Sequence, residues 1–440
     1  MNAYEREMRL MPHVIKMEER GIHIDVPLLR TDMNFYFNKM SEMDDFISMK
    51  CKRKVDVDSN DQLADGIEFA GLSKGFASTP TGRRSTSKES LMGAIADPEL
   101  LGALLIRGSL ATCLRTFYQP WYSAARKTGK LYVKWNQIRN YSDTGARTGR
   151  FSSSPNFQNV PTDWDKLLVQ LGSIGYNLNF PLPQMRKYII PAPGYVLIGR
   201  DYRSQEMRLL AHFTQGALME ALIANPELDV HEIAGKMANI SRKLSKTMGF
   251  AILYGAGAAR VAEQLGITVY ESRDLKARYL RALPEIKKFT KEVNDKAAYG
   301  EGITTLGGRY YSIQSPAIVK GVLKSFEYKL VNYKIQGSAA DHTKEAMYQY
   351  ATTTKTGHLL LTVHDQNVIE VPKDDIMSER KIFADAMNGS FADVLKVKML
   401  SDECIGYDFA NLRSFDEGER IDSLLGRSER NYDGYQTNTV

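Results

Sequence analysis

Cysteine is scarce in this 440-residue sequence, which has only Cys51, Cys113 and Cys404, placed far apart. No CxxC pair or Cys/His cluster occurs, which excludes a disulfide framework and a zinc site of the usual spacing. Apolar runs of transmembrane length are lacking, and the N-terminal MNAYEREMRL alternates charged and apolar residues instead of placing an apolar stretch after a basic one. The sequence therefore predicts free thiols and a cytoplasmic protein with no membrane span or secretory signal.

What the sequence does contain is an ordinary globular composition and an uneven distribution of charge. Hydrophobic residues make up 43% and charged residues 25%, so the chain can bury a large core and form several subdomains. Residues 72–150 hold thirteen lysines and arginines against four acids, whereas the first 71 residues and the last forty are net acidic. The basic stretch suits a polyanion such as nucleic acid, although a solvated surface would give the same pattern.

Hydrophobic periodicity predicts a mixed α+β fold. Helical spacing runs through residues 1–50, 88–125 and 203–298, and the Ser/Thr/Gly/Pro-rich stretch 56–87 indicates an exposed loop. Residues 130–139 alternate as a strand, 195–201 form a short buried strand, and 358–371 form an apolar hairpin with a polar His-Asp-Gln at its middle. Helices combined with antiparallel strands favour an α+β architecture over a doubly wound sheet.

Two aspartates mark the ends of the apolar strands. Asp201 follows YVLIGR and Asp365 lies in the hairpin tip after LLLTVH, so we expect both side chains to meet at the rim of a sheet. Such a carboxylate pair can hold two divalent cations, which activate an attacking hydroxyl and neutralise a leaving pyrophosphate. Mg²⁺ suits this role because it takes few protein carboxylates and keeps phosphates and waters as its other ligands. Each aspartate alone would equally suit a turn or a cap.

Four residues at intervals of four, Arg242, Lys246, Phe250 and Tyr254, form a stripe on one face of a predicted helix. Two cations followed by two aromatic side chains suit the triphosphate, sugar and base of a nucleotide. An amphipathic surface helix with buried aromatic residues would show the same spacing. Gly255 directly follows and fits a helix C-cap.

This stripe resembles motif B of family A DNA polymerases, the polymerase-I-like type. DYRSQEMRLLAHF at 201–213 resembles motif A and TVHDQNVIEV at 362–371 resembles motif C, in the family's order and spacing. Five further segments are similar: SNDQL at 59–63, PTGRRST at 80–86, TGRFSSSPNFQNVP at 148–161, DVHEIAG at 229–235 and NYKIQGSAAD at 332–341. The resemblance covers nearly all of residues 5–410 and implies the right-hand polymerase fold, with an antiparallel-sheet palm and helical fingers and thumb.

The resemblance implies a catalytic metal site. Asp201 and Asp365, with the backbone carbonyl of Tyr202, would bind two Mg²⁺ ions, for which Mn²⁺ would substitute. Lys246 would be the third catalytic residue, because it would neutralise the triphosphate and donate a proton to pyrophosphate as it leaves.

The resemblance also implies a nucleotide pocket and a DNA-binding surface. Glu206 would exclude a ribose 2′-hydroxyl, Phe250 would pack on the sugar, and Tyr254 would close the pocket beside the template base. A phenylalanine at 250 implies poor use of dideoxynucleotides. The phosphates would be contacted by Arg242 and His231. The primer-template duplex would be contacted in its minor groove by Arg150, Gln158, Asn159, Asn332, Gln336 and His364.

Two positions depart from the family pattern. Most relatives read His-Asp-Glu in motif C, where this chain has His364-Asp365-Gln366, and many have a basic residue at the position of Tyr328. Gln366 removes a negative charge beside the metals, so we expect activity with weaker metal affinity. Two alternative hypotheses stay open: a catalytically inactive relic that binds primer-template DNA, and an enzyme that makes RNA or copies RNA templates. Glu206 argues against ribonucleotide use.

The implied subdomains are an N-terminal segment at 1–25, a thumb at 26–130, a palm at 131–212 and 324–440, and fingers at 213–323. The palm would include a polar tail after about residue 415. Only three residues precede YEREMRL, the start of the segment that joins an exonuclease domain to the thumb in relatives. We therefore expect a DNA-directed DNA polymerase without proofreading, and so compact a replicative enzyme would suit a bacteriophage or a mobile element. It would act as a monomer on primer-template DNA and dNTPs, aided by a separate exonuclease, helicase or processivity factor.

Overall fold

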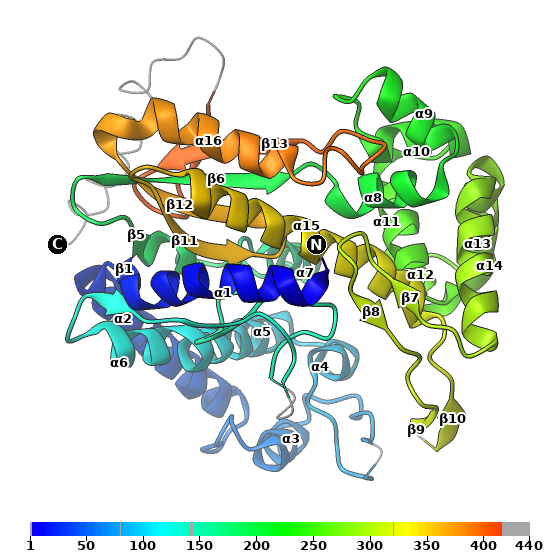
Figure 1. The fold of residues 1–440 in the computed structure, drawn as a ribbon. Coiled ribbons are helices and arrows are strands. Elements are labelled where there is room, and N and C mark those ends of the chain that lie inside the picture. The colour runs from blue at the N-terminus through cyan, green and yellow to red at the C-terminus, as the bar shows by residue number, and fades with distance from the viewer. Residues whose placement is uncertain (1, 80, 141–143, 320, 416–440) are drawn as a thin grey trace.

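The computed structural model describes residues 2–79, 81–140, 144–319 and 321–415. A five-stranded antiparallel sheet lies between a mainly helical N-terminal part on one side and helix α16 on the other, and a separate helical lobe stands beside it (Figure 1). The α+β architecture expected from the sequence is confirmed. The polar tail expected after residue 415 lies outside the described residues.

The central sheet has the strand order β11-β12-β6-β13-β14. Strand β6 is buried along most of its length, which explains its continuous apolar run. Near its end, the Asp201 side chain is exposed. Two helices, α15 and α16, pack against this sheet. The bounds are β6 Tyr195–Tyr202, α15 Lys329–Thr353, β11 His358–Val363, β12 Gln366–Pro372, η3 Lys373–Asp375, α16 Ile376–Gly389, β13 Ser401–Gly406 and β14 Arg413–Ser414.

The N-terminal part corrects three expectations about secondary structure. Strand β1 interrupts the helices of residues 3–50, the predicted loop 56–87 contains helix α3, and the predicted strand 130–139 is divided into β2 and β3. The elements before β6 are α1 Ala3–Arg20, β1 Ile22–Ile24, α2 Val26–Lys50, α3 Asn60–Phe69, α4 Lys88–Ala94, α5 Pro98–Cys113, the π-helix η1 Leu114–Tyr118, α6 Gln119–Ala125, β2 Lys130–Leu131, β3 Lys134–Asn136, β4 Ser152–Ser154, α7 Asp165–Ser173, η2 Met185–Tyr188 and β5 Ile189–Ile190.

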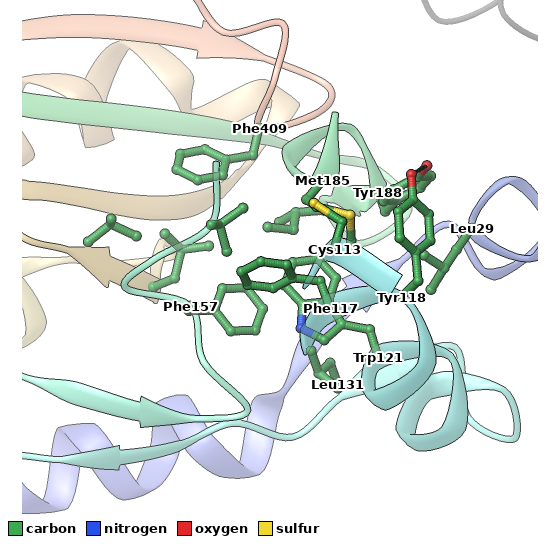
Figure 2. Close-up of a cluster of buried hydrophobic side chains, with 14 of the residues drawn as sticks. Leu29, Cys113, Phe117, Tyr118, Trp121, Leu131, Phe157, Met185, Tyr188 and Phe409 are labelled. Carbon is green, nitrogen blue, oxygen red and sulfur yellow. Dashed lines mark hydrogen bonds between the residues drawn. The ribbon is translucent and has the colours of Figure 1, made fainter. Parts of the chain in front are cut away.

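An aromatic cluster holds the N-terminal helices against the loop that follows β4. Trp121 of α6 stacks on Phe157 with ring centroids 4.7 Å apart and an interplanar angle of 11° (Figure 2). The hydroxyls of Tyr118 and Tyr188 are 2.8 Å apart within the same cluster. Because Phe157 is fully buried, the residues that follow it are held in place. The stretch Pro98–Ala125 is long and apolar enough to cross a membrane by length and composition, and most of it is buried inside the protein.

The helical lobe has a hydrophobic cluster separate from that of the sheet and N-terminal part. Two short hairpins, β7–β8 and β9–β10, lead from it back to α15. Its elements are α8 Gln205–Thr214, α9 Ala217–Ala224, α10 Val230–Ala238, α11 Arg242–Leu253, α12 Ala258–Leu265, α13 Val269–Ala282, α14 Pro284–Ala298, β7 Ile303–Thr304, β8 Tyr310–Tyr311, β9 Ala317–Val319 and β10 Val322–Lys324.

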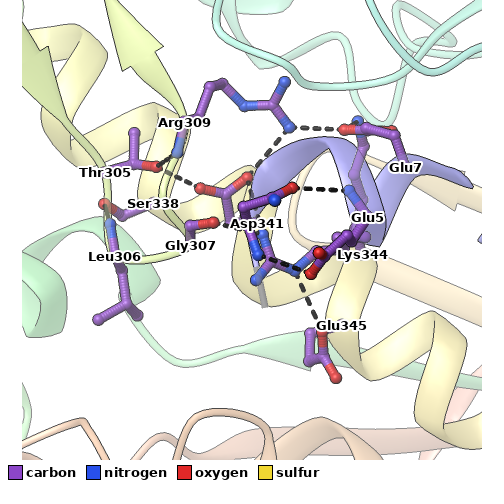
Figure 3. Close-up of polar contacts among 12 residues, drawn as sticks. Glu5, Glu7, Thr305, Leu306, Gly307, Arg309, Ser338, Asp341, Lys344 and Glu345 are labelled. Atoms are coloured by element: carbon purple, nitrogen blue, oxygen red, sulfur yellow. Dashed lines mark hydrogen bonds and ion pairs between the residues drawn. The ribbon is translucent and has the colours of Figure 1, made fainter. Parts of the chain in front are cut away.

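A buried ionic network fastens α1 to the middle of α15 and to the β7–β8 hairpin (Figure 3). Asp341 of α15 is fully buried and accepts a hydrogen bond from the Arg309 guanidinium (3.0 Å), while Arg6 of α1 lies 3.7 Å away. Glu7 accepts from the Arg309 guanidinium (2.5 Å) and from the Lys344 ammonium (2.6 Å). Burial lowers the pKa of Lys344 to about 8 despite these partners. The network joins three segments that are distant in the sequence.

Removal of Asp341 should therefore destabilise the fold strongly. In an Asp341→Ala variant, Arg6 and Arg309 would remain buried with one carboxylate fewer, and we expect a loss of about 3–5 kcal/mol in the free energy of unfolding. Urea denaturation measures this quantity. The control is Asp295→Ala, which breaks the exposed Lys291–Asp295 pair (2.6 Å) and should change stability by no more than about 0.5 kcal/mol. Equal effects of the two substitutions would contradict a structural role for the network.

Candidate active site

The strand register places three polar side chains in one row across the central sheet. Asp201 of β6 lies directly opposite Gln366 of β12 on one side and opposite Asp402 of β13 on the other. Residues directly opposite one another in antiparallel strands project from the same face. The next side chain, Tyr202, projects from the other face, where its hydroxyl donates a hydrogen bond to the Met387 carbonyl of α16 (3.0 Å). Asp201 therefore points away from α16, and it is exposed at the end of β6.

The turn that carries Asp365 is held from two sides. The Gln158 amide nitrogen donates to the Thr362 carbonyl (2.8 Å), and its amide oxygen accepts from the His364 N–H (3.2 Å). The Tyr202 N–H donates to the Asp365 carbonyl (3.4 Å), which ties the turn to the end of β6. These contacts bring the two aspartates to adjacent strand ends, as the sequence predicted.

The aspartates influence each other electrostatically. The Asp201 side chain is exposed on one side, but surrounding protein removes part of its hydration, and this desolvation, followed by the charges of Asp365 and Asp402, raises its pKa to about 7. Arg186 acts in the opposite direction, and its guanidinium lies 4.5 Å from the centre of the Phe409 ring. Carboxylates that repel one another in this way are stabilised by a bound cation.

The oxygen donors at this site fit Mg²⁺. The carboxylates of Asp201 and Asp365 and the backbone carbonyl of Tyr202 are hard oxygen ligands of the kind that Mg²⁺ prefers. Within the part of the chain that the structure describes, no group of three or more His, Cys, Asp or Glu side chains is arranged to hold a metal ion. Asp402, the further carboxylate in the row, is paired with the Arg203 guanidinium (2.5 Å).

Gln366 lies directly opposite Asp201, on the same face of the sheet. Its amide nitrogen is 4.0 Å from the Cys404 sulfur, and a Cβ added to Gly199 would lie 3.2 Å from that nitrogen. The amide is thus packed over the middle of β6, next to Asp201. An uncharged side chain at this position limits the negative charge that accumulates in the row.

Helix α11 displays the four-residue stripe as predicted. It buries Ser245, Met248 and Gly249 on its inner face, while Lys246 is exposed on the outer one. The rings of Phe250 and Tyr254 stack with centroids 6.0 Å apart, and the His231 ring of α10 lies 5.8 Å from that of Phe250. Tyr254 ends the helix, and Gly255 follows with a positive φ of 63°. Among the described residues, neither Arg242 nor Lys246 contacts Asp201 or Asp365 through a hydrogen bond or ion pair.

A chain of polar contacts joins the end of α11 to α8, to the segment before β4 and to α15. Glu206 of α8 is buried and forms an ion pair with Arg150. The Tyr254 hydroxyl donates to Glu206 (3.3 Å) and accepts from the Gln336 amide (2.8 Å). Desolvation raises the pKa of Glu206, and Arg150 and Tyr254 oppose this rise. Four residues proposed from sequence as nucleotide or DNA contacts therefore touch one another directly.

The cation at the start of α11 already has a partner. The Arg242 guanidinium donates to Asp229 at 2.6 and 3.0 Å, and Asp229 also caps α10 by accepting from the Glu232 N–H. His231, two residues further, is buried, and desolvation with the charges of Lys246 and Arg242 lowers its pKa to about 4 although Asp229 opposes the shift. His231 is therefore neutral at neutral pH and retains one ring N–H as a donor.

The remaining predicted DNA contacts lie around this core. Asn159 is exposed and, together with Trp164, lines a cavity of about 540 Å³ between α5 and the loop after β4. Asn332 of α15 is half-buried, and its amide nitrogen has no hydrogen-bond partner among the residues that the structure describes. His364 is exposed at the hairpin turn. Sequence reasoning missed Arg186 and Asp402, which lie near Asp201 only because of the fold.

Comparison with known proteins identifies the family. The sequence model described as DNA polymerase family A matches residues 29–411. The chain belongs to DNA polymerase family A. It is 28% identical over 400 residues to the thermostable DNA polymerase I of Thermus filiformis, covering 87% of this chain and 45% of that protein. It is also 28% identical over 382 residues to DNA polymerase I of Helicobacter pylori, covering 84% and 40%.

A solved structure shows the same fold. The POL domain of Pol1 from M. smegmatis, in a complex with DNA primer-template and dNTP, matches with a TM-score of 0.76 and 23% identity. The match covers 92% of this chain and 70% of that one. The chain spans about half or less of the length of the curated relatives it matches.

Replacement of Asp201 tests the metal site. Because its pKa is higher in the folded protein than in the unfolded chain, the charged carboxylate destabilises the fold progressively as pH rises from about 4, and fully above pH 7. At pH 8 without metal we expect Asp201→Asn to melt a few degrees higher than wild type, roughly the effect of 1 kcal/mol. It should lose most of the wild-type increase in melting temperature on addition of Mg²⁺, measured by calorimetry. Asp385→Asn, on the exposed side of α16, is the control. An undiminished Mg²⁺ response in Asp201→Asn would rule out this site.

Proposed function

We propose that this chain is a template-directed DNA polymerase that adds deoxynucleotides to a primer 3′-hydroxyl. The observation that carries the proposal is the convergence of Asp201 and Asp365 at adjacent strand ends, on a face where Asp201 is destabilised by like charge. Membership of family A supports it, as do the relatives named DNA polymerase I. Deoxynucleotides, primer-template DNA and Mg²⁺ would be its substrates and cofactor.

The residues divide the chemical work between the sheet and α11. Asp201, Asp365 and the Tyr202 carbonyl would hold two Mg²⁺ ions, which activate the primer hydroxyl and neutralise the pyrophosphate when bound. The exposed Lys246 ammonium would meet the triphosphate and donate a proton to the leaving group. Neutral His231 would donate its ring N–H to a phosphate oxygen.

The pocket would select the sugar and the base pair. The buried Glu206 carboxylate, fixed by Arg150 and Tyr254, would fill the space needed by a ribose 2′-hydroxyl. Phe250 would pack on the sugar. Tyr254 would break its hydrogen bond with Gln336 to admit the template base. A conformational closure of α11 over a matched pair would then complete the site.

We further propose the subdomains expected from the sequence: thumb at 26–130, palm at 131–212 and 324–440, and fingers at 213–323, with residues 1–25 preceding them. The chain would extend primers without excising mismatched ends, and a separate exonuclease, helicase or processivity factor would assist it. A monomeric state, a location in the cytoplasm and a phage origin stay predictions.

Primer extension tests the proposed activity. With a labelled primer-template, Mg²⁺ and four dNTPs, we expect extension by wild type and by Asp385→Asn. Asp201→Asn and Asp365→Asn should lose roughly 10²–10³-fold or more in rate, because the charge at the reacting phosphate is then left without its stabilising ions. Glu206→Ala should raise ribonucleotide incorporation. A wild type that binds the DNA but never extends it, even with Mn²⁺, would support the inactive relic instead.

The Arg242–Asp229 pair gives a second test, on nucleotide affinity. Asp229→Asn keeps an N-cap acceptor for the Glu232 N–H but removes the carboxylate that competes with phosphates for Arg242. We expect this variant to bind dATP with Mg²⁺ about threefold more tightly in calorimetric titration, since an exposed ion pair contributes up to about 1 kcal/mol. Asp274→Asn, which breaks the exposed pair with Arg278 (2.9 Å), should leave affinity unchanged. Weaker binding by Asp229→Asn would show that the pair organises the phosphate site.

A further inference from the structure

A cavity of about 290 Å³ lies where α1 packs along α15 and β11 (Figure 1). It is bounded by the last turns of α1, the C-terminal end of α15 and the start of β11. The side chains with nitrogen donors around it are His13, Lys16, Arg20, Lys355 and His358. Strand β11 leads from His358 to the turn with Asp365, so the cavity lies roughly 20 Å from the candidate metal site. It is therefore separate from the candidate active site.

Positive charge is in excess at this cavity. Lys16 and Lys355 are exposed, and within the part of the chain that the structure describes neither ammonium forms a hydrogen bond or an ion pair. Arg20 pairs with Glu370 (2.5 Å). Glu379 is also nearby, but it is fully buried and accepts from the backbone N–H of Lys355 (2.9 Å). Three cations thus surround the cavity, and both nearby acids are buried and already bonded to donors.

Contacts on two sides hold the Arg20 side chain in place. Its Nε donates to the buried Glu370, which also accepts from the Ala192 N–H (2.6 Å). The guanidinium carbon lies 5.3 Å from the centre of the Tyr195 ring. The two terminal NH₂ groups form no hydrogen bond to any residue that the structure describes, and their fixed fork can grip an anion with two parallel donors. Because the side chain is already ordered, little conformational freedom would be lost on binding.

Two histidine rings add donors without adding charge. His13 and His358 each pack against a tyrosine ring, with centroids 5.8 and 6.2 Å apart. Desolvation lowers the pKa of both rings, and the charges of Lys16 and Arg20 lower it further, although the two buried acids oppose the shift at His358. Both rings are therefore neutral at neutral pH, and each carries one N–H.

This set of donors suits a phosphate group. A phosphate ester carries a charge of about −1.5 to −2 at pH 7 and three acceptor oxygens, so it can bind several cations and N–H groups at once. A carboxylate carries one charge on two oxygens and would leave part of the donors unused. Guanidinium and ammonium groups are also the usual protein partners of phosphate. The volume is at the lower end for ligand cavities, which favours a small anion.

We infer that the cavity between α1, α15 and β11 binds a phosphate-type anion, either free pyrophosphate or the 5′-phosphate at a nucleic-acid end. Arg20 would hold two phosphate oxygens, Lys16 and Lys355 would neutralise the charge from the solvent side, and the histidines would donate their ring N–H groups. The inference goes beyond the proposed function and does not depend on it, because no residue of the metal site or of α11 takes part.

Calorimetric titration with pyrophosphate at low salt tests this site. EDTA is included so that no metal ion carries pyrophosphate to the aspartates. We expect wild type to bind one pyrophosphate, and Lys16→Ala/Lys355→Ala to bind it about tenfold more weakly, equivalent to about 1.4 kcal/mol for two exposed charges. The matched control, Lys166→Ala/Lys381→Ala, removes the same charge from exposed positions on α7 and α16 and should bind as wild type does. Equal weakening in the control would overturn the inference, since net charge alone would then attract the anion.

Lys246→Ala on α11 separates this site from the candidate active site. Undiminished pyrophosphate binding by this variant is expected. Loss of binding in Lys246→Ala, together with unchanged binding in Lys16→Ala/Lys355→Ala, would place the anion on α11 and contradict the inference.

A 5′-phosphorylated trinucleotide and its unphosphorylated form identify the source of the phosphate. If the phosphorylated form binds more tightly than pyrophosphate, and Lys16→Ala/Lys355→Ala loses this binding, the site takes a nucleic-acid end. If pyrophosphate binds more tightly, the site takes a free anion. A wild type that binds neither probe would refute the site, and binding of hexaglutamate alone would assign the cavity to an acidic peptide instead.

Discussion

The site depends on the backbone register of β6 between β12 and β13. Seven residue pairs join β6 to β12 and six join it to β13. A slip of one residue would turn Asp201 toward α16 and separate it from Asp365, because side chains alternate between faces. Arg200 helps to fix the register, since its guanidinium donates to Glu403 (2.6 Å) and to the Ser401 carbonyl (3.1 Å) on the face opposite to Asp201. The buried face therefore determines where the exposed carboxylate lies.

With this register, the row of side chains that contains Asp201, Gln366 and Asp402 has an excess of negative charge. Asp365 and Asp402 raise the pKa of Asp201, Arg186 lowers it, and Asp402 is itself paired with Arg203. A glutamate in place of Gln366, directly opposite Asp201, would add another carboxylate to this row. In the metal-free protein such a charge would be repelled, whereas an amide packed beside Cys404 is not. The glutamine is thus compatible with the fold and with a two-aspartate site, and its effect falls on how strongly cations are attracted.

The sequence predicted those parts of the site that local patterns encode. Strands β6 and β11 are apolar runs that lead to polar residues, and the α11 stripe follows from a spacing of four, so the sequence predicted where Asp201, Asp365 and Tyr254 lie in these elements. Helix α3 was missed because it is short and lies between turn-forming residues, although Leu63 and Ile67 form a buried stripe on it. Arg186 and Asp402 have no local signal. They reach Asp201 through strand pairing and a 3-10 turn, and a linear sequence does not reveal such proximity.

Helix α15 connects helix α1 to Tyr254 at the end of α11. Its 25 residues span roughly 37 Å, and its middle is clamped to α1 by Asp341 and Lys344. Nearer its start, Gln336 holds Tyr254 by one hydrogen bond. The helical lobe has its own hydrophobic cluster, and polar contacts at Tyr254 and Glu206 join the end of α11 to its surroundings, so the proposed closure of α11 would require these polar contacts to exchange. In the proposed closure of α11, Tyr254 would be the first residue to move, because its hydrogen bond to Gln336 is what joins the end of α11 to α15.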